Sequence, residues 1–164
     1  MNFLPVNERI TQDIVDTLKT IRKVNGYAND VTVERIKKGG NAPLAGQSLA
    51  VVRQGSPIRV PEESIGQDWW EQPYFIDCYI NPAEDLTEPP DKAMNIFRAD
   101  VEKALTYQEA SLNRGGLAQE TIIKSPGYFV MPSSGRFVVQ VNIAVRFATE
   151  KNNPYKSPYS NVNP

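Results

Sequence analysis

The stretch FVVQVNIAVRFA, residues 137–148, decides the fold. Apolar side chains occupy every second position from Phe137 to Phe147, and small or polar residues separate most of them. Successive side chains of a strand point to opposite faces of its sheet. The alternation therefore predicts one long strand with a buried face and a wetter face, which is typical of an antiparallel sheet covered on one side.

A second long strand is predicted over residues 69–80, where apolar and polar side chains again alternate. Its buried face would hold Tyr74, Ile76, Cys78 and Ile80. Shorter strands, bounded by Gly, Pro and Asn, are expected over residues 31–36, 48–60 (two strands around a turn), 121–124 and 128–131.

The first of two predicted helices covers residues 7–24, with Asn7 as its N-cap and Gly26 as its stop. Its apolar positions recur every three or four residues, at Ile10, Ile14, Leu18 and Ile21. The second helix opens at Pro89-Pro90, because proline fits the first helical turn. Its apolar positions are Ala93, Ile96, Phe97, Val101, Ala104 and Leu105.

The order helix, strands, helix, strands predicts an α+β fold, with a mainly antiparallel (mixed) β-sheet and two α-helices packed on one face. At 164 residues, of which 40% are apolar, the chain suffices for one domain with a core. We expect that domain over residues 1–149 and an extended C-terminal tail over residues 150–164, where Asn, Pro, Ser and Tyr dominate.

The formal net charge of −1 argues against a general nucleic-acid binder, but it conceals two opposed regions. Residues 60–91 contain nine acids and no Lys or Arg, whereas the rest of the chain carries eighteen bases against ten acids, a net of +8. The nine acids are Glu62, Glu63, Asp68, Glu71, Asp77, Glu84, Asp85, Glu88 and Asp91.

No arrangement of residues predicts catalysis, and we expect neither a cofactor nor a metal site. The chain has no histidine, and its single cysteine, Cys78, follows Asp77 in an apolar strand, where thiolate formation is disfavoured. The pairs Gly39-Gly40 and Gly115-Gly116 lack the neighbouring residues that a phosphate-binding loop needs. No stretch reaches the roughly 20 apolar residues of a membrane helix, so no membrane contact is expected.

Two features are candidates for binding a partner. Basic residues gather at Lys19, Arg22, Lys23, Arg35, Lys37 and Lys38. Cations at the end of a helix complement its dipole, which is an alternative explanation for the first three. Aromatic residues gather at Trp69, Trp70, Tyr74, Phe75 and Tyr79, and the tail adds Tyr155 and Tyr159. Such residues form interface hot spots, although they can also cover the edge of a core.

The second half of the chain contains four short motifs in a fixed order: DVEKAL at 100–105, GGLA at 115–118, VNIAVRF at 141–147 and NPY at 153–155. This order resembles the tail-terminator and tail-completion (minor tail, neck) proteins of bacteriophages. In that family a helix of D-[IV]-E-x-A-L type precedes a Gly-rich connection. A closing strand with an apolar-Arg-aromatic end and a short [DN]-P-Y segment follow.

The resemblance implies a tail-tube-like or terminator-like fold and a structural, non-enzymatic role in the virion. Such proteins form a homo-oligomeric ring, commonly a hexamer, which caps the tail tube at the head–tail junction. The implied partners are further copies of the chain, the tail tube protein and a neck, head-completion or portal-proximal protein, with assembly in the host cytoplasm. Genomic DNA would pass through the lumen without specific binding.

Within this interpretation, residues 60–90 are expected to form an inserted acidic loop or hairpin that makes ring contacts or lines the lumen. The candidate assembly interface comprises Trp69, Trp70, Tyr74, Phe75, Glu84, Asp85, Tyr155 and Tyr159, and the six basic residues above form its candidate complement. A head-completion or neck adaptor on the portal side is the nearest alternative. A small nucleic-acid-binding protein is the alternative from another functional class.

Overall fold

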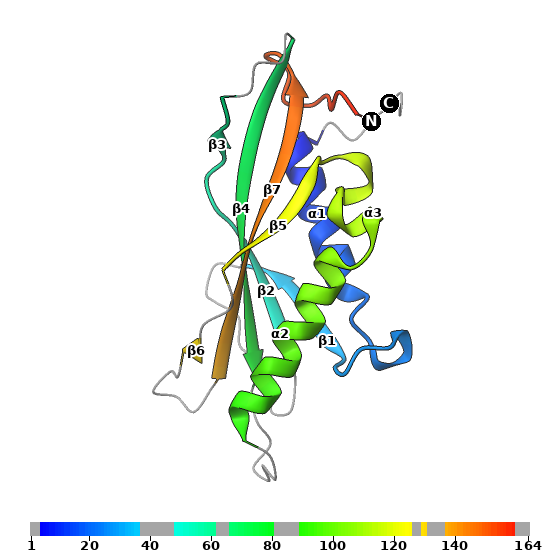
Figure 1. Cartoon of the computed structure of the whole chain (residues 1–164), viewed down its shortest axis with the longest axis vertical. Coiled ribbons are helices and arrows are strands. Elements are labelled where there is room, and N and C mark those ends of the chain that lie inside the picture. Colours follow the sequence, from blue (N-terminus) through cyan, green and yellow to red (C-terminus); the bar gives the residue numbers. More distant parts are fainter. Residues whose placement is uncertain are drawn as a thin grey trace.

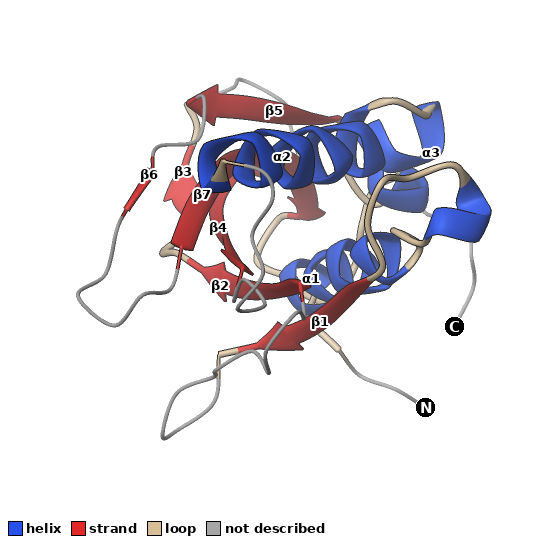
Figure 2. Ribbon diagram, turned by 90° about the horizontal axis from the view of Figure 1, so that it is seen from below, coloured by secondary structure: helices blue, strands red, loops and turns tan. Residues whose placement is uncertain are grey.

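The computed structural model describes residues 4–36, 48–61, 66–80, 89–125, 129–130 and 137–159. Its main elements pack as a curved sheet with helices on one side (Figures 1 and 2). The elements are α1 (Val6–Lys19), η1 (Lys23–Asn25), β1 (Val31–Arg35), β2 (Ser48–Gln54), β3 (Ile58–Arg59), β4 (Gln67–Ile80), α2 (Pro90–Thr106), α3 (Glu109–Leu112), η2 (Arg114–Gly116), β5 (Glu120–Ser125), β6 (Phe129–Val130) and β7 (Phe137–Glu150).

The sheet has the order β1-β2-β4-β7-β5, with the short strands β3 and β6 paired to β4 and β7. Only β1 and β2 pair in parallel among the described strands. The longest ladder joins β4 to β7 without a break, from Gln67 opposite Glu150 to Ile80 opposite Phe137. The predicted α+β class, a mixed and mostly antiparallel sheet with two main helices packed against it, is therefore confirmed.

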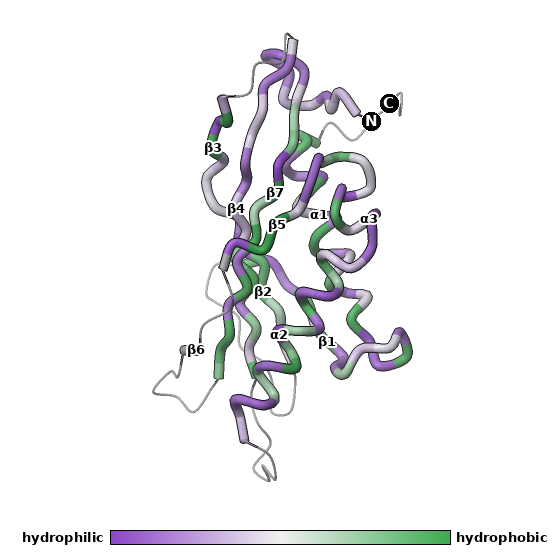
Figure 3. The backbone as a smooth tube through the Cα atoms, viewed as in Figure 1, coloured by the Kyte–Doolittle hydropathy of each residue, from purple (hydrophilic) through white to green (hydrophobic). Residues whose placement is uncertain are grey.

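The core lies between the sheet and the two helices, as the sequence pattern predicts. Every residue of the first helical stripe is 0% exposed: Ile10, Ile14, Leu18 and Ile21. From the sheet, the facing side chains include Ile76, Val139 and Val141, also at 0%. In Figure 3 the hydrophobic segments lie along β2, β7 and the inner turns of the helices, whereas the connection from α1 to β1 is mostly hydrophilic.

The opposite face of β7 is drier than its alternation predicts. Ala144 is 1% exposed, Ala148 is 0% exposed and Gln140 is 9% exposed. A small alanine is readily covered by the longer side chains of adjacent strands, and Gln140 Nε2 donates to Asp77 Oδ1 at 2.6 Å. Small size and cross-strand pairing therefore keep these three positions from water without a helix above them.

The first helix begins and ends earlier than expected. The N-cap position is Pro5, which makes no side-chain cap, so Asn7 lies inside α1 and its assignment as N-cap is wrong. The helix stops at Lys19, and the Thr20 hydroxyl donates to the carbonyl oxygen of Thr17 at 2.6 Å. Gly26 takes the left-handed conformation expected of it (φ 82°), but at the end of η1. A threonine hydroxyl that bonds backward competes with helix propagation.

Two expectations about segments differ from the structure. Within the acidic segment 60–90, residues 67–80 are strand β4, which lies between β2 and β7 rather than in an inserted loop. The C-terminal tail is not extended over its described part, because it turns at Lys151–Asn152 and folds back against the end of β7 and the start of α1. Backbone bonds hold it there, including Glu150 N to Lys156 O and Val6 N to Pro154 O, both 2.9 Å.

Candidate assembly surfaces

On the sheet face opposite the helices, Asp77 of β4 is enclosed by polar partners. Arg53 of β2 donates to its carboxylate through Nε at 2.6 Å and through Nη2 at 3.1 Å, and Gln140 of β7 donates from the other side. The same guanidinium lies 5.3 Å from the ring centre of Phe75. Asp77 is only 7% exposed, so this negative charge is satisfied within the sheet.

Glu71 forms a second cluster of charges on that face. Arg146 lies directly opposite it on β7 and donates from Nε at 3.0 Å, and Lys124 of β5 approaches its other oxygen at 3.0 Å. Arg146 also bonds Glu120 at 3.2 Å. The hydrogen bonds from Lys124 and Arg146 lower the pKa of Glu71 below its ordinary value.

Asp68, near the start of β4, is the third acid of this strand, and it joins the sheet to the tail. Its Oδ1 accepts from Arg59 of β3 at 2.6 Å, and its Oδ2 accepts from the backbone N–H of Asn152 at 2.9 Å. All three acids of β4 are thus paired within the chain. Of the remaining six, Asp91 is exposed in the first turn of α2, and the others lie outside the described residues: Glu62, Glu63, Glu84, Asp85 and Glu88.

The predicted aromatic interface divides between core and surface. Tyr74 is 0% exposed beneath α1, where its hydroxyl lies 3.0 Å from that of Thr11, so it is a core residue and cannot contact a partner. Burial raises its pKa well above the ordinary range. Trp69 is 8% exposed and meets Tyr159 edge-on, with ring centres 6.1 Å apart. Trp70 and Phe75 are half-buried.

The end of the sheet that carries the tail exposes large apolar groups. Tyr155 is 52% exposed and Tyr159 43%, while Ile58 of β3 and Leu4 before α1 are 62% and 40% exposed. A cavity of about 500 Å³ opens at the same end, with Trp70 and residues of the tail in its wall. Tyr155 and Tyr159 therefore remain candidates for an interface, and Ile58 and Leu4 join them.

Of the described residues of the predicted basic patch, Arg35 lies apart from the others. Arg35 pairs with Glu8 (Nη2–Oε2 3.2 Å), about three turns or 16 Å of α1 away from Lys19. Lys19 pairs with Asp16 at 3.2 Å. Arg22 and Lys23 are exposed beyond the end of α1, and Lys37 and Lys38 lie outside the described residues.

A buried arginine is the polar centre that the sequence pattern does not reveal. Arg114 is 0% exposed and donates to Asp13 at 3.2 Å, to Thr121 Oγ1 at 3.0 Å and to the carbonyl oxygen of Leu105. Burial lowers its pKa and raises that of Asp13, although the attraction between the two charges opposes both shifts. The cluster ties α1, α2 and β5 together. In the sequence, Arg114 stands in an Asn-Arg-Gly-Gly connection that is typical of an exposed loop.

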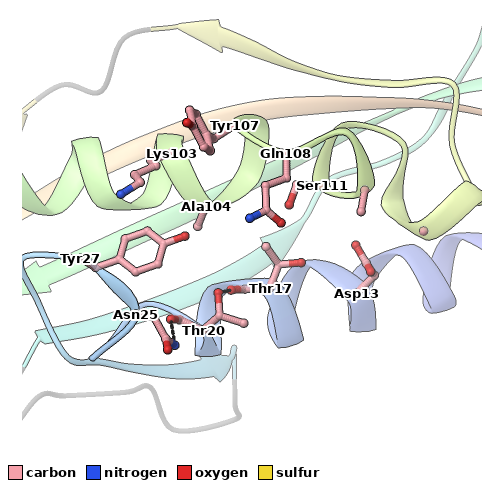
Figure 4. A pocket seen from close by; sticks show the side chains of 12 residues that line it. Asp13, Thr17, Thr20, Asn25, Tyr27, Lys103, Ala104, Tyr107, Gln108 and Ser111 are labelled. Atoms are coloured by element: carbon pink, nitrogen blue, oxygen red, sulfur yellow. Dashed lines mark hydrogen bonds between the residues drawn. The ribbon is translucent and has the colours of Figure 1, made fainter. Parts of the chain in front are cut away.

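A cavity of about 420 Å³ lies between α1 and the α2–α3 segment (Figure 4). Polar side chains from both sides line it: Asp13, Thr17 and Thr20 of α1, Asn25 and Tyr27 of the following connection, and Lys103, Tyr107, Gln108 and Ser111 opposite. Lys103 Nζ donates to Gly26 O at 3.1 Å and lies 4.7 Å from the ring centre of Tyr27. No pattern in the sequence indicates this hollow.

Chemistry elsewhere is sparse in the described ranges. Three or more Asp, Glu or Cys side chains do not gather there into a metal-binding group. Cys78 is fully buried, and burial next to Asp77 raises the pKa of its thiol far above the ordinary range. Among the described helices, none is long and apolar enough to cross a bilayer. The sequence matches no protein-family model and no curated protein sequence.

Proposed function

We propose that the protein is a structural component of a phage virion: a tail terminator that caps the tail tube as a homo-oligomeric ring at the head–tail junction. The ring would offer its other side to the head or neck. This role requires complementary surfaces and a rigid frame rather than a catalytic centre.

The observation that carries the proposal is the ordered run of family-like motifs from Asp100 to Tyr155. Residues of three of these motifs hold the frame together. The Asp100 carboxylate accepts from the backbone N–H groups of Ala28 and Asn29, and so attaches the α1–β1 connection to α2. Arg146 joins β4, β5 and β7 through its ion pairs. In the NPY segment, Asn153 Oδ1 accepts from the N–H of Tyr155, and the following residues cover the end of the sheet.

A ring requires one patch on a subunit to meet a different patch on its neighbour. The two ends of this molecule carry different kinds of residues. One end carries the exposed Tyr155, Tyr159 and Ile58. At the opposite end, β4 finishes at Ile80 and α2 begins at Pro90 (Figure 1), and the chain between them contains Glu84, Asp85 and Glu88.

The proposal is tested on the full chain by sedimentation velocity and negative-stain imaging. We expect closed rings with a central opening, and binding of those rings to one end of isolated tail tubes. Chains that remain monomeric at high micromolar concentration and are absent from purified virions would refute the proposal. Rings that bind heads lacking tails, but not tubes, would assign the protein to the portal side as a head-completion adaptor.

A further inference from the structure

The cavity of about 500 Å³ at the tail end of the sheet lies on the same face as the helices, where the helical layer stops. Strands form its floor. Trp70 of β4 lies directly between Arg59 of β3 and Phe147 of β7, and in the next row Asp68 lies opposite Thr149. The first turn of α1 and the tail beyond β7 form its walls. The site is therefore built on paired strands rather than on a single loop.

Two polar groups of the floor have no partner in the fold. Thr149 is only 4% exposed, yet its hydroxyl forms no hydrogen bond to a described residue, and its oxygen is not sealed off from the cavity. A buried hydroxyl without a hydrogen bond is unfavourable. The indole N–H of the half-buried Trp70 also has no described acceptor. Both groups can therefore be satisfied only by a molecule inside the cavity.

Three asparagine side chains add hydrogen-bonding groups at the rim. Those of Asn7 and Asn152 form no hydrogen bond to a described residue. Asn153 uses only its oxygen, which accepts from the N–H of Tyr155 at 3.2 Å, so its NH₂ group is unused. An amide both donates and accepts, as does the Thr149 hydroxyl. The cavity thus offers several neutral groups that hydrogen-bond in both directions.

The charges that line the cavity cancel. Arg59 and Asp68 are its charged lining residues, and they pair at 2.6 Å. The second oxygen of Asp68 accepts from the N–H of Asn152 at 2.9 Å. A phosphate would meet no unpaired base in the lining, and a cation would meet no unpaired carboxylate. Lys151, at the exposed turn beside Asn152, has no described partner, so its contribution is tested below.

We propose that this cavity binds a neutral saccharide. One face of a pyranose ring consists of C–H groups, which pack on aromatic rings such as those of Trp70 and Phe147. The hydroxyl groups around its edge each donate and accept, as the amides and the threonine of the cavity do. The volume lies in the range of small-molecule sites and is enough for about one or two sugar units.

The unused acceptors favour a saccharide over a proline-rich peptide. Such a peptide also packs on aromatic rings, but proline has no backbone N–H to donate. It would leave the oxygens of Thr149, Asn7 and Asn152 without donors, whereas sugar hydroxyls supply them. One chain contributes the whole lining, so the inference does not depend on the proposed ring.

Two adjacent tryptophans on opposite faces of β4 make the inference testable on the full chain. Trp70 lines the cavity, whereas Trp69 packs against Tyr159 on the other face. The indole N–H signals are followed by NMR, with Trp69→Phe and Trp70→Phe for assignment. The probes are glucose, galactose, mannose, N-acetylglucosamine and their disaccharides. We expect at least one to shift the Trp70 signal saturably and to leave the Trp69 signal in place.

Thr149→Val tests the floor without changing its shape. It removes the unpaired hydroxyl, and we expect the bound sugar to dissociate about tenfold more readily while the melting temperature does not fall. Asn152→Ala, at the exposed turn, should weaken binding in the same direction. Lys151→Gln beside it and Thr17→Val in the cavity between α1 and α2–α3 are the controls, and both should bind like the wild type. Circular dichroism melts of each variant check that folding is intact.

Several outcomes would overturn the inference: no saturable shift with any sugar, unchanged binding by Thr149→Val, or an equal shift with glycerol, which would mean adventitious polyol binding only. A polyproline peptide that shifts the Trp70 signal when sugars do not would assign the cavity to a peptide instead. Tighter binding of a disaccharide than of its component sugars would support a longer glycan as the source, and equal binding would support a free sugar. Sugar binding by a chain that never forms rings would leave this inference standing and refute the terminator function.

Discussion

The two faces of the sheet solve the problem of burial in different ways. Beneath the helices, the side chains are apolar and dry, with Ile76, Phe97 and Val141 all 0% exposed. On the other face, bases stand across from acids on neighbouring strands, and Glu71 lies directly opposite Arg146. Because the register pairs opposite charges, the acidity of β4 in the sequence does not become an acidic surface. Only acids beyond its ends remain available to a partner.

Removing a large side chain beneath the helices should have the largest effect. Phe97→Ala leaves a cavity in a fully buried site and should lower the free energy of unfolding by about 3–5 kcal/mol. Phe75→Ala, on the half-buried opposite face, should cost less than half as much. Urea denaturation of both variants measures the difference, and equal losses would contradict the contrast between the faces.

The buried arginine should rank next. Arg114→Met leaves the Leu105 carbonyl, Thr121 and Asp13 without their donor, and we expect a loss of about 3 kcal/mol. Since Asp13 is partly exposed, its charge can recover some hydration, which keeps the loss below that of a fully buried pair. The double variant with Asp13→Asn should lose less than the sum of the single changes in urea denaturation. Strict additivity would mean that the two groups are not coupled.

The contrast between Arg114 and β7 explains how far the sequence could predict the structure. Periodicity predicts β4, β7 and the inward face of α1, because apolar spacing and burial have the same cause. Periodicity cannot predict the burial of Arg114, because that burial depends on Asp13, 101 residues away, and on a backbone φ of 50° in a glycine-rich connection. Nor can it predict the charge pairs of β4, because their register is set by tertiary structure.

The pH dependence of stability should have opposite signs for Glu71, on the sheet face opposite the helices, and for Asp13 of α1. Hydrogen bonds lower the pKa of Glu71 in the folded state, so its stabilisation is present above the unfolded pKa and is lost as pH falls between about 5 and 3. Burial raises the pKa of Asp13, so its protonation favours the folded state over the same range. Glu71→Gln should therefore flatten the acid-induced loss of stability, and Asp13→Asn should steepen it.

The measurement is the urea midpoint of each variant at intervals from pH 6 to pH 3, with Asp16→Asn as the control. Asp16 is exposed and pairs only at the surface, so its replacement should change the stability little. A Glu71→Gln profile as steep as the wild-type profile would show that the ion pairs of Glu71 contribute no stability at neutral pH.

The smallest effect on stability is expected where the tail covers Trp69, on the sheet face opposite the helices. Tyr159→Ala removes the edge-on contact with Trp69 and should cost about 0.5–1.5 kcal/mol, the range for an aromatic pair. Because Trp69 is only 8% exposed, loss of its cover should shift the tryptophan emission to longer wavelength. Tyr155→Ala, in the same segment but without a ring contact among the described residues, should change neither quantity. Identical spectra for the two variants would mean that the tail does not cover Trp69, and that the face opposite the helices is closed by strand side chains alone.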